Sequence, residues 1–179
     1  MSVSRAELSL LTLPTAAAAQ APRLLILYTG GTVGMAVNKQ QQLVPMHFDK
    51  LDRLMPELRQ LPYHLQLLAL PKPIDSSNVT PADWLQLARL VGEYYADYEG
   101  FVILHGTDTM AYSAAALSFL LEHLGKPVVF TGAQVPVGRS RSDATRNLLT
   151  ALEIAAARHP CAPRRTDRPR ARRQRARRP

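Results

Sequence analysis

The sequence contains a single cysteine, Cys161, among its 179 residues. One cysteine can form neither an intrachain disulfide nor a cysteine-based metal cage. Aromatic residues make up only 6% of the chain, so leucine, alanine, valine and isoleucine must fill the core. No apolar run approaches the roughly 20 residues that span a bilayer. The histidines show no metal-ligand spacing. We therefore expect no membrane span, no bound metal and no cofactor.

Charge is distributed unevenly along the chain. The formal net charge is +8, and residues 163–179, with nine arginines and one aspartate, account for all of it. A neutral body excludes a uniformly basic nucleic-acid-binding fold. The tail has two explanations: a basic arm that binds nucleic acid or an acidic surface, or a reading-frame slip in a GC-rich gene. We favour the slip and expect no nucleic-acid partner, because no aromatic residues interleave with the arginines for base stacking.

The composition suggests three segments. Residues 1–22 are expected to be a flexible extension, because Glu7 and Pro14 interrupt the apolar stretch that a signal peptide needs. A signal peptide remains the alternative for this segment. Residues 23–159 are expected to form one α/β domain. Residues 160–179 are expected to be a disordered tail rich in arginine and proline.

Short apolar runs alternate with helical patterns, which predicts an α/β fold with a doubly wound, mostly parallel sheet. Strands are expected over Leu24–Tyr28, Tyr63–Leu70, Gly100–Gly106 and Val128–Thr131. Helices are expected over Asp49–Leu61, from Thr80 onward, over Thr109–Leu124 with Gly125 as terminator, and over Ser142–Arg158. Thr80 and Asp83 have the spacing of a capping box. Residues 35–47 have no clear period and are expected to be a mobile loop.

Polar clusters follow three of the predicted strands. They are Thr29–Thr32, Asp75–Asn78 and Thr107–Thr109. In doubly wound sheets, ligands bind beyond the carboxyl ends of the strands. The topology therefore predicts that these clusters lie together at one edge of the sheet.

Each cluster alone leaves alternatives open. The segment from Thr29 to Gly34 lacks the first glycine of a dinucleotide loop, so it either presents Thr32 to a ligand or is a plain turn. Asp108 could bind an ammonium group or cap the next helix. His105 could be a base, although a lone histidine at a strand end is more often structural. The cluster after the second strand reads as a turn when taken singly.

Together the clusters carry a resemblance. The segments Thr29-Gly30-Gly31-Thr32, Asp75-Ser76-Ser77 and His105-Gly106-Thr107-Asp108-Thr109 occur in the order and context of the L-asparaginase/glutaminase family. The surrounding sequence resembles the cytoplasmic type I bacterial enzymes of this family. It includes the segments LLILYTGGTVGM and GFVILHGTDTMAYSAAALSFLLEHLGKPVVFTGAQVP. The resemblance covers about residues 23–159.

The resemblance implies that L-asparagine is hydrolysed to L-aspartate and ammonia through an acyl-enzyme on a threonine. It implies Thr32 as the nucleophile and places Thr107 and Asp108 in the second catalytic cluster, where Asp108 also binds the substrate α-ammonium. Asp75, Ser76 and Ser77 match the substrate-binding segment, in which Ser76 holds the α-carboxylate. It also implies a cytoplasmic protein that forms a homo-oligomer when complete.

The sequence departs from the family pattern at two places. Leu43 stands where many members have a tyrosine in the loop after the first cluster. The family continues past the last predicted helix with a strand that supplies a lysine and with a smaller C-terminal domain, whereas the last lysine here is Lys126. The resemblance therefore implies a C-terminally truncated asparaginase. The alternative is a non-catalytic fragment that binds an amino acid, or a protein whose tail binds nucleic acid, because a threonine is a poor nucleophile without a base.

Overall fold

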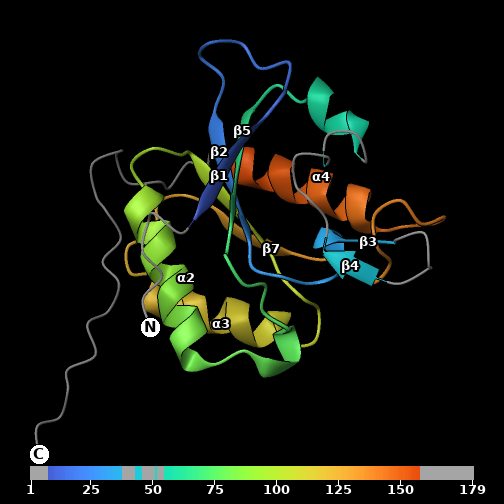
Figure 1. Cartoon of the computed structure of the whole chain (residues 1–179). Helices are drawn as coiled ribbons and strands as arrows, with labels where there is room; N and C mark the ends of the chain where they lie inside the picture. Colours follow the sequence, from blue (N-terminus) through green and yellow to red (C-terminus); the bar gives the residue numbers. More distant parts are fainter. Residues whose placement is uncertain (1–7, 38–42, 46–50, 52–54, 158–179) are drawn as a thin grey trace, which may run out of the picture.

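A five-stranded sheet forms the centre of the protein (Figure 1). The computed structural model describes residues 8–37, 43–45, 51 and 55–157. The strands lie in the order β1-β5-β2-β6-β7. Their bounds are β1 Ser9–Leu13, β2 Arg23–Tyr28, β5 His64–Ala69, β6 Gly100–Leu104 and β7 Val128–Thr131. Strand β1 is antiparallel to β5 and all other pairs are parallel, which confirms the predicted mostly parallel sheet.

Helices cover both faces of this sheet. Helices α2 (Pro81–Tyr94) and α3 (Met110–Leu120) pack on one face, and α4 (Ala144–Ala156) packs on the other (Figure 1). The alternation of side chains along β2 explains the two layers. Leu24 and Ile26 belong to the core under α4, whereas Leu25 and Leu27 belong to the core under α2 and α3. A strand buried on both faces reads as a continuous apolar run, as this one does.

The order of the strands locates the crevice in which ligands bind. From β2 the chain crosses to β5 on one side, and it later returns to β6 on the other side of β2. Tyr28, the last residue of β2, lies level with Ala69 of β5 and Leu104 of β6. In open parallel sheets such a switch point leaves a crevice at the carboxyl ends of the strands. The three polar clusters follow β2, β5 and β6 and therefore meet at this crevice.

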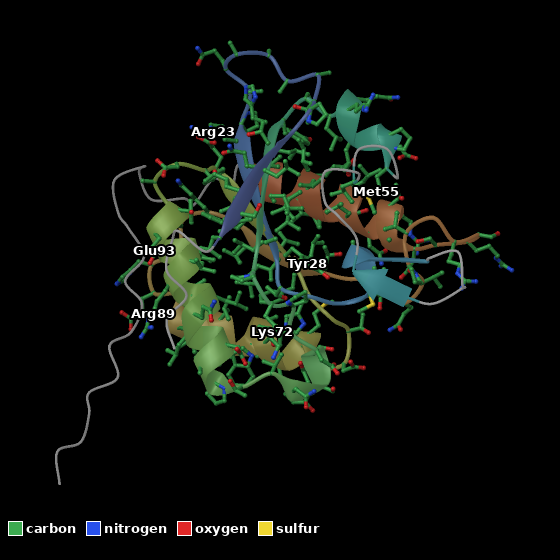
Figure 2. The ribbon with its side chains drawn as sticks, viewed as in Figure 1. Arg23, Tyr28, Met55, Lys72, Arg89 and Glu93 are labelled. Atoms are coloured by element: carbon green, nitrogen blue, oxygen red, sulfur yellow. The ribbon has the colours of Figure 1, made fainter. Side chains whose placement is uncertain are left out.

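Helix α2 begins with the predicted capping box. The Asp83 carboxylate accepts hydrogen bonds from the Thr80 backbone N–H at 2.8 Å and from the Thr80 hydroxyl at 2.7 Å. Pro81 occupies the first turn, where its missing N–H costs nothing. Arg89 and Glu93 lie on the outer, exposed side of the helix (Figure 2).

Lys126 lies at the opposite edge from the crevice. It precedes β7, and its ammonium group donates to the backbone carbonyls of Tyr95 and of Tyr98 just beyond the C-terminal end of α2. The same group lies 4.6 Å from the centre of the Tyr95 ring, within the range of a cation–π contact. Lys126 therefore ties α2 to the amino end of β7.

Two segments expected to be irregular contain strands. Ser9–Leu13, within the extension expected over residues 1–22, pairs with β5 as β1. In the loop expected over residues 35–47, β3 (Met35–Val37) pairs with β4 (Leu43–Pro45) in a second, antiparallel sheet. Residues 38–42 and 46–47 of that loop lie outside the described residues. The expectation of an irregular loop over residues 35–47 fails because β3 and β4, with three residues each, are too short to show alternation.

Helix boundaries differ from the expected ones at three places. Within the helix expected over 49–61, residues 49–50 and 52–54 lie outside the described residues. Met55 has the non-helical angles φ −129° and ψ 73°, and Pro56 begins a 3-10 helix, Pro56–Gln60, because a proline disfavours α geometry in the residue before it. Helix α3 ends at Leu120 rather than Leu124, and the N–H of Gly125 is donated to the Tyr95 hydroxyl. Helix α4 begins two residues after Ser142.

None of the described helices is long and apolar enough to cross a membrane.

The capping box predicts a stability effect that one substitution measures. Asp83→Ala removes the acceptor of both Thr80 hydrogen bonds and should lower the free energy of unfolding by about 1 kcal/mol. Urea denaturation followed by circular dichroism measures it. Asp97→Ala, at an exposed aspartate beyond the other end of the helix, is the matched control and should change stability by less than about 0.5 kcal/mol. Equal losses in both variants would contradict the capping role.

Candidate active site

The loop after β2 depends on two glycines with left-handed backbone angles. Gly30 has φ 142° and Gly31 has φ 86°. A Cβ atom on Gly30 would lie 2.1 Å from the carbonyl oxygen of Ile74, in the loop after β5. Just before them, Thr29 is buried and donates both its N–H and its hydroxyl to the Leu104 carbonyl at the end of β6. The loop is thereby fixed against both neighbouring strands.

The loops after β2 and β6 approach each other at a pair of glycines. A Cβ atom on Gly31 would lie 2.7 Å from the backbone nitrogen of Gly106. A Cβ atom on Gly106 would in turn lie 2.4 Å from the Ser76 hydroxyl, in the loop after β5. All three predicted clusters therefore meet at one point. Thr32 and Thr107 are the residues that directly follow Gly31 and Gly106.

Two hydrogen bonds join the cluster after β5 to the cluster after β6. The Ser76 hydroxyl donates to a carboxylate oxygen of Asp108 at 2.6 Å, and the Thr109 hydroxyl donates to the Ser76 carbonyl at 2.6 Å. Ser76 is buried, whereas Asp108 is exposed. An ionised carboxylate has about four acceptor positions, so Asp108 keeps capacity for a ligand beyond this one bond. The site thus presents an oriented carboxylate to solvent.

Asp75 and Ser77 form a local turn at the rim. Asp75 accepts from the Ser77 N–H at 3.0 Å and from the Ser77 hydroxyl at 2.8 Å, and both residues are exposed. These two bonds lower the pKa of the Asp75 carboxyl below its usual value. Asp75 caps the 3-10 helix Ser76–Asn78, and these bonds hold both side chains at the surface, while Ser76 between them is buried.

Thr32 begins a short 3-10 helix, Thr32–Gly34, and is half-buried. Gly34 lies against the buried ring of Tyr28, since a Cβ atom there would lie 2.2 Å from the Tyr28 hydroxyl oxygen. Burial raises the pKa of Tyr28 to about 12, so its phenol stays protonated near neutral pH. Figure 2 shows Tyr28 near the centre of the molecule. The nucleophile candidate therefore lies on backbone that packs against the core.

His105 belongs to a buried hydrogen-bond chain. Its Nδ1 lies 2.6 Å from the Gly106 carbonyl, its Nε2 lies 3.0 Å from the Ser113 hydroxyl, and Trp84 Nε1 donates to the same hydroxyl at 2.9 Å. One proton arrangement satisfies every member: Nδ1–H donates to the carbonyl, and the serine donates to Nε2 of a neutral ring. His105 therefore stabilises the Gly106 turn, in line with the structural role favoured by the sequence.

A fourth segment, which follows β7, lies at the same edge and was not among the predicted clusters. The Gln134 amide donates to the Thr107 hydroxyl oxygen at 3.0 Å. The carboxylate of Asp143 accepts from the backbone N–H groups of Gln134 and Val135. The rule that predicted the other clusters applies equally to the carboxyl end of β7, so the position of this segment could have been found.

The described residues offer no group of three or more metal-ligating side chains. Two cavities flank the crevice. A cavity of about 460 Å³ lies beside Asp75, and an open apolar groove of about 650 Å³ runs from Thr107 along α3 and β7. The residues that line the groove are mostly apolar; those from α3 include Met110, Ala111, Ala114 and Leu117.

The fold and site define a class: an α/β domain with threonine hydroxyls and a carboxylate at the switch point of its sheet. The chain belongs to the family described as Asparaginase, N-terminal, which matches residues 23–163. This finding confirms the family that the three clusters predicted.

The chain is also similar to individual proteins. L-asparaginase 1 of Escherichia coli is 47% identical over 140 residues, which are 76% of this chain and 41% of that protein. A 60 kDa lysophospholipase of Mus musculus is 41% identical over 157 residues, 74% of this chain and 28% of that protein. The crystal structure of L-asparaginase I from Vibrio cholerae superimposes with a TM-score of 0.68 at 45% identity, covering 75% of this chain and 41% of that one. The chain thus spans less than half the length of these relatives.

The contact between Gly31 and Gly106 predicts a graded effect of added methyl groups. Gly31→Ala should lower the free energy of unfolding well beyond the roughly 1 kcal/mol that a left-handed alanine costs, because the methyl group collides with backbone. Gly138→Ala is the matched control, since Gly138 has φ 82° and is exposed. Thermal unfolding compares the two variants. Losses of the same size would show that the close approach is absent.

Proposed function

We propose that this chain forms the amino-acid-binding, nucleophile-bearing domain of an L-asparaginase, which hydrolyses L-asparagine to L-aspartate and ammonia. The observation that supports it most is the Ser76–Asp108 hydrogen bond beside the contact between Gly31 and Gly106. Asp108 binds the substrate α-ammonium by a charge-assisted hydrogen bond. Before the substrate binds, the Ser76 hydroxyl holds the Asp108 carboxylate in place. When the substrate binds, the single hydroxyl proton of Ser76 turns from Asp108 to the substrate α-carboxylate. Asp75 and Ser77 form the rim of the same subsite.

In the proposed reaction, the Thr32 oxygen attacks the carbon of the side-chain amide. The C–N bond breaks, the hydroxyl proton passes through a base to the leaving nitrogen, and ammonia departs from a Thr32 ester. Water then attacks that ester and releases L-aspartate and the free hydroxyl. Thr107 lies beside the attacked group, and backbone N–H groups near Thr32 and Thr107 stabilise the oxyanion.

A second candidate is amino-acid binding without turnover. The family resemblance expects a lysine that raises basicity beside Thr107 and Asp108. Among the described residues the lysines are Lys72, which is exposed after β5, and Lys126, which is held at the opposite edge. Losing general-base help typically lowers a rate by about 10²–10⁴-fold. This placement favours retained binding with weak hydrolysis.

Assembly with a second copy belongs to the same proposal, together with a cytoplasmic location. Tyr112 and Phe119 on α3 are 70% and 77% exposed, and the apolar groove runs beside them to β7, the last strand of the described sheet. Exposed apolar surface of this kind is typical of protein interfaces. A second copy of the chain would cover it.

Binding and turnover are tested on the full chain by titration calorimetry with L-aspartate and by ammonia release from L-asparagine. Thr32→Ala should abolish ammonia release and keep L-aspartate binding, because it removes only the nucleophile. Asp108→Asn should weaken binding about 10- to 100-fold, since a charged hydrogen bond is lost. Asp97→Asn is the matched control and should behave like the unsubstituted chain.

Each result separates the candidates. Binding with ammonia release supports the hydrolase, whereas binding alone supports the second candidate. If L-aspartate and L-asparagine do not bind, or if Asp108→Asn binds as well as the unsubstituted chain, both candidates are wrong.

The oligomer is tested by light scattering coupled to size-exclusion chromatography. The unsubstituted chain should elute with a mass above the 19.8 kDa of one copy, and Phe119→Arg should shift it to that of one copy. Ile154→Arg, at an exposed apolar residue on α4, is the matched control and should keep the larger mass. A single-copy mass for the unsubstituted chain would contradict this part of the proposal.

A further inference from the structure

The Thr107 hydroxyl has a partner that restricts the direction of its own proton. Gln134 Nε2 donates to Thr107 Oγ1 at 3.0 Å. A hydroxyl has one proton and two lone pairs, and here one lone pair is occupied. An amide NH₂ group cannot accept, so the Thr107 proton must point away from Gln134. Thr107 is half-buried at the crevice, where that proton is available to another acceptor.

Four further bonds hold the backbone around Gln134 in place. The Asp143 carboxylate accepts from the Gln134 N–H at 3.1 Å and from the Val135 N–H at 3.0 Å. These bonds, that of Val135 first, lower the pKa of the Asp143 carboxyl, so it stays ionised near neutral pH. The Asn147 amide donates to the same carboxylate at 3.1 Å and to the Gly132 carbonyl at 3.0 Å. The loop is thereby tied to the first turn of α4.

The same loop packs directly against the end of β6. A Cβ atom on Gly132 would lie 2.4 Å from the carbonyl oxygen of His105, so the backbone at Gly132 approaches β6 as closely as only glycine allows. Gln134 is exposed, and nothing in the core requires an amide there. Its one described side-chain hydrogen bond is the one to Thr107. Asp143 and Asn147 therefore fix the backbone from which the Gln134 side chain reaches Thr107.

We propose that Gln134, held by Asp143 and Asn147, is a positioning residue that makes the Thr107 hydroxyl a hydrogen-bond donor toward an acceptor oxygen of the bound amino acid. This inference rests on the proposed function. The segment after β7 thereby has a role in the site. The Thr107 hydroxyl accepts a hydrogen bond from Gln134 and donates one to the ligand.

The contact itself is tested without a ligand. In the ¹⁵N-labelled full chain, Thr107→Val should shift the side-chain amide resonances of Gln134, because their acceptor is lost. Thr150→Val, at an exposed threonine on α4, is the matched control and should leave them in place. Unchanged Gln134 resonances in Thr107→Val would overturn the inference.

The role is tested by a double-mutant cycle on L-aspartate binding. Gln134→Met should weaken binding about fivefold in the unsubstituted chain, the size expected of one hydrogen bond. The same substitution should have no effect when Thr107→Val is already present, because Gln134 then has no hydroxyl to orient. Gln60→Met, at an exposed glutamine, is the matched control and should change nothing.

A second substitution, Gln134→Glu, reverses the direction of the hydrogen bond between residue 134 and the Thr107 hydroxyl. A glutamate carboxylate accepts the Thr107 proton, so Gln134→Glu should weaken L-aspartate binding more than Gln134→Met does. Most of this additional loss of binding should vanish when Thr107→Val is also present. Equal losses in both backgrounds would show that Gln134 acts through loop structure or charge alone and would overturn the inference. If the unsubstituted chain binds no L-aspartate, the proposed function fails, and the inference drawn from it fails too.

Discussion

The candidate site depends on the close approach of three backbone loops, which only glycine permits. Gly30 leaves room for the Ile74 carbonyl, Gly31 for the Gly106 nitrogen, and Gly106 for the Ser76 hydroxyl. Each approach is shorter than a Cβ atom tolerates, and the first two glycines also have left-handed backbone angles. With these contacts in place, two threonines and a carboxylate from distant parts of the sequence lie around one crevice. Without them, the loops after β2, β5 and β6 would move apart.

The glycine contacts fix the site because the strands that carry the loops are themselves held in the core. Strand β2 is buried on both faces, and its neighbours β5 and β6 are fixed in register beside it. Polar hydrogen bonds extend the support into the loops: the buried His105 is hydrogen-bonded to the carbonyl of Gly106, and the half-buried Asp143 to the backbone of the segment after β7. Preorganised polar groups of this kind need little rearrangement when a ligand binds. The helices thus stabilise the sheet, the strand ends hold the loops, and the loops present the polar groups.

Much of this arrangement could be predicted from the sequence. Continuous apolar runs predicted the strands, and their alternation with helical patterns predicted a mostly parallel sheet with three clusters at one edge. Local rules failed where tertiary contacts or proline decided the outcome. Strand β1 forms because β5 offers it an edge, and Met55 leaves the helical conformation because Pro56 follows it. The exact partners in the site were beyond the sequence: the place of the segment after β7 can be predicted, but not that Gln134 within it donates to Thr107.

The central claim is that the three clusters form one site for a small amino acid. A crystal structure of the full chain grown with L-aspartate tests it most directly. The account predicts the α-ammonium group within about 3 Å of an Asp108 carboxylate oxygen, and the side-chain carboxylate beside Thr32 and Thr107. L-aspartate bound elsewhere, or a crevice that stays empty at saturating concentration, would contradict it.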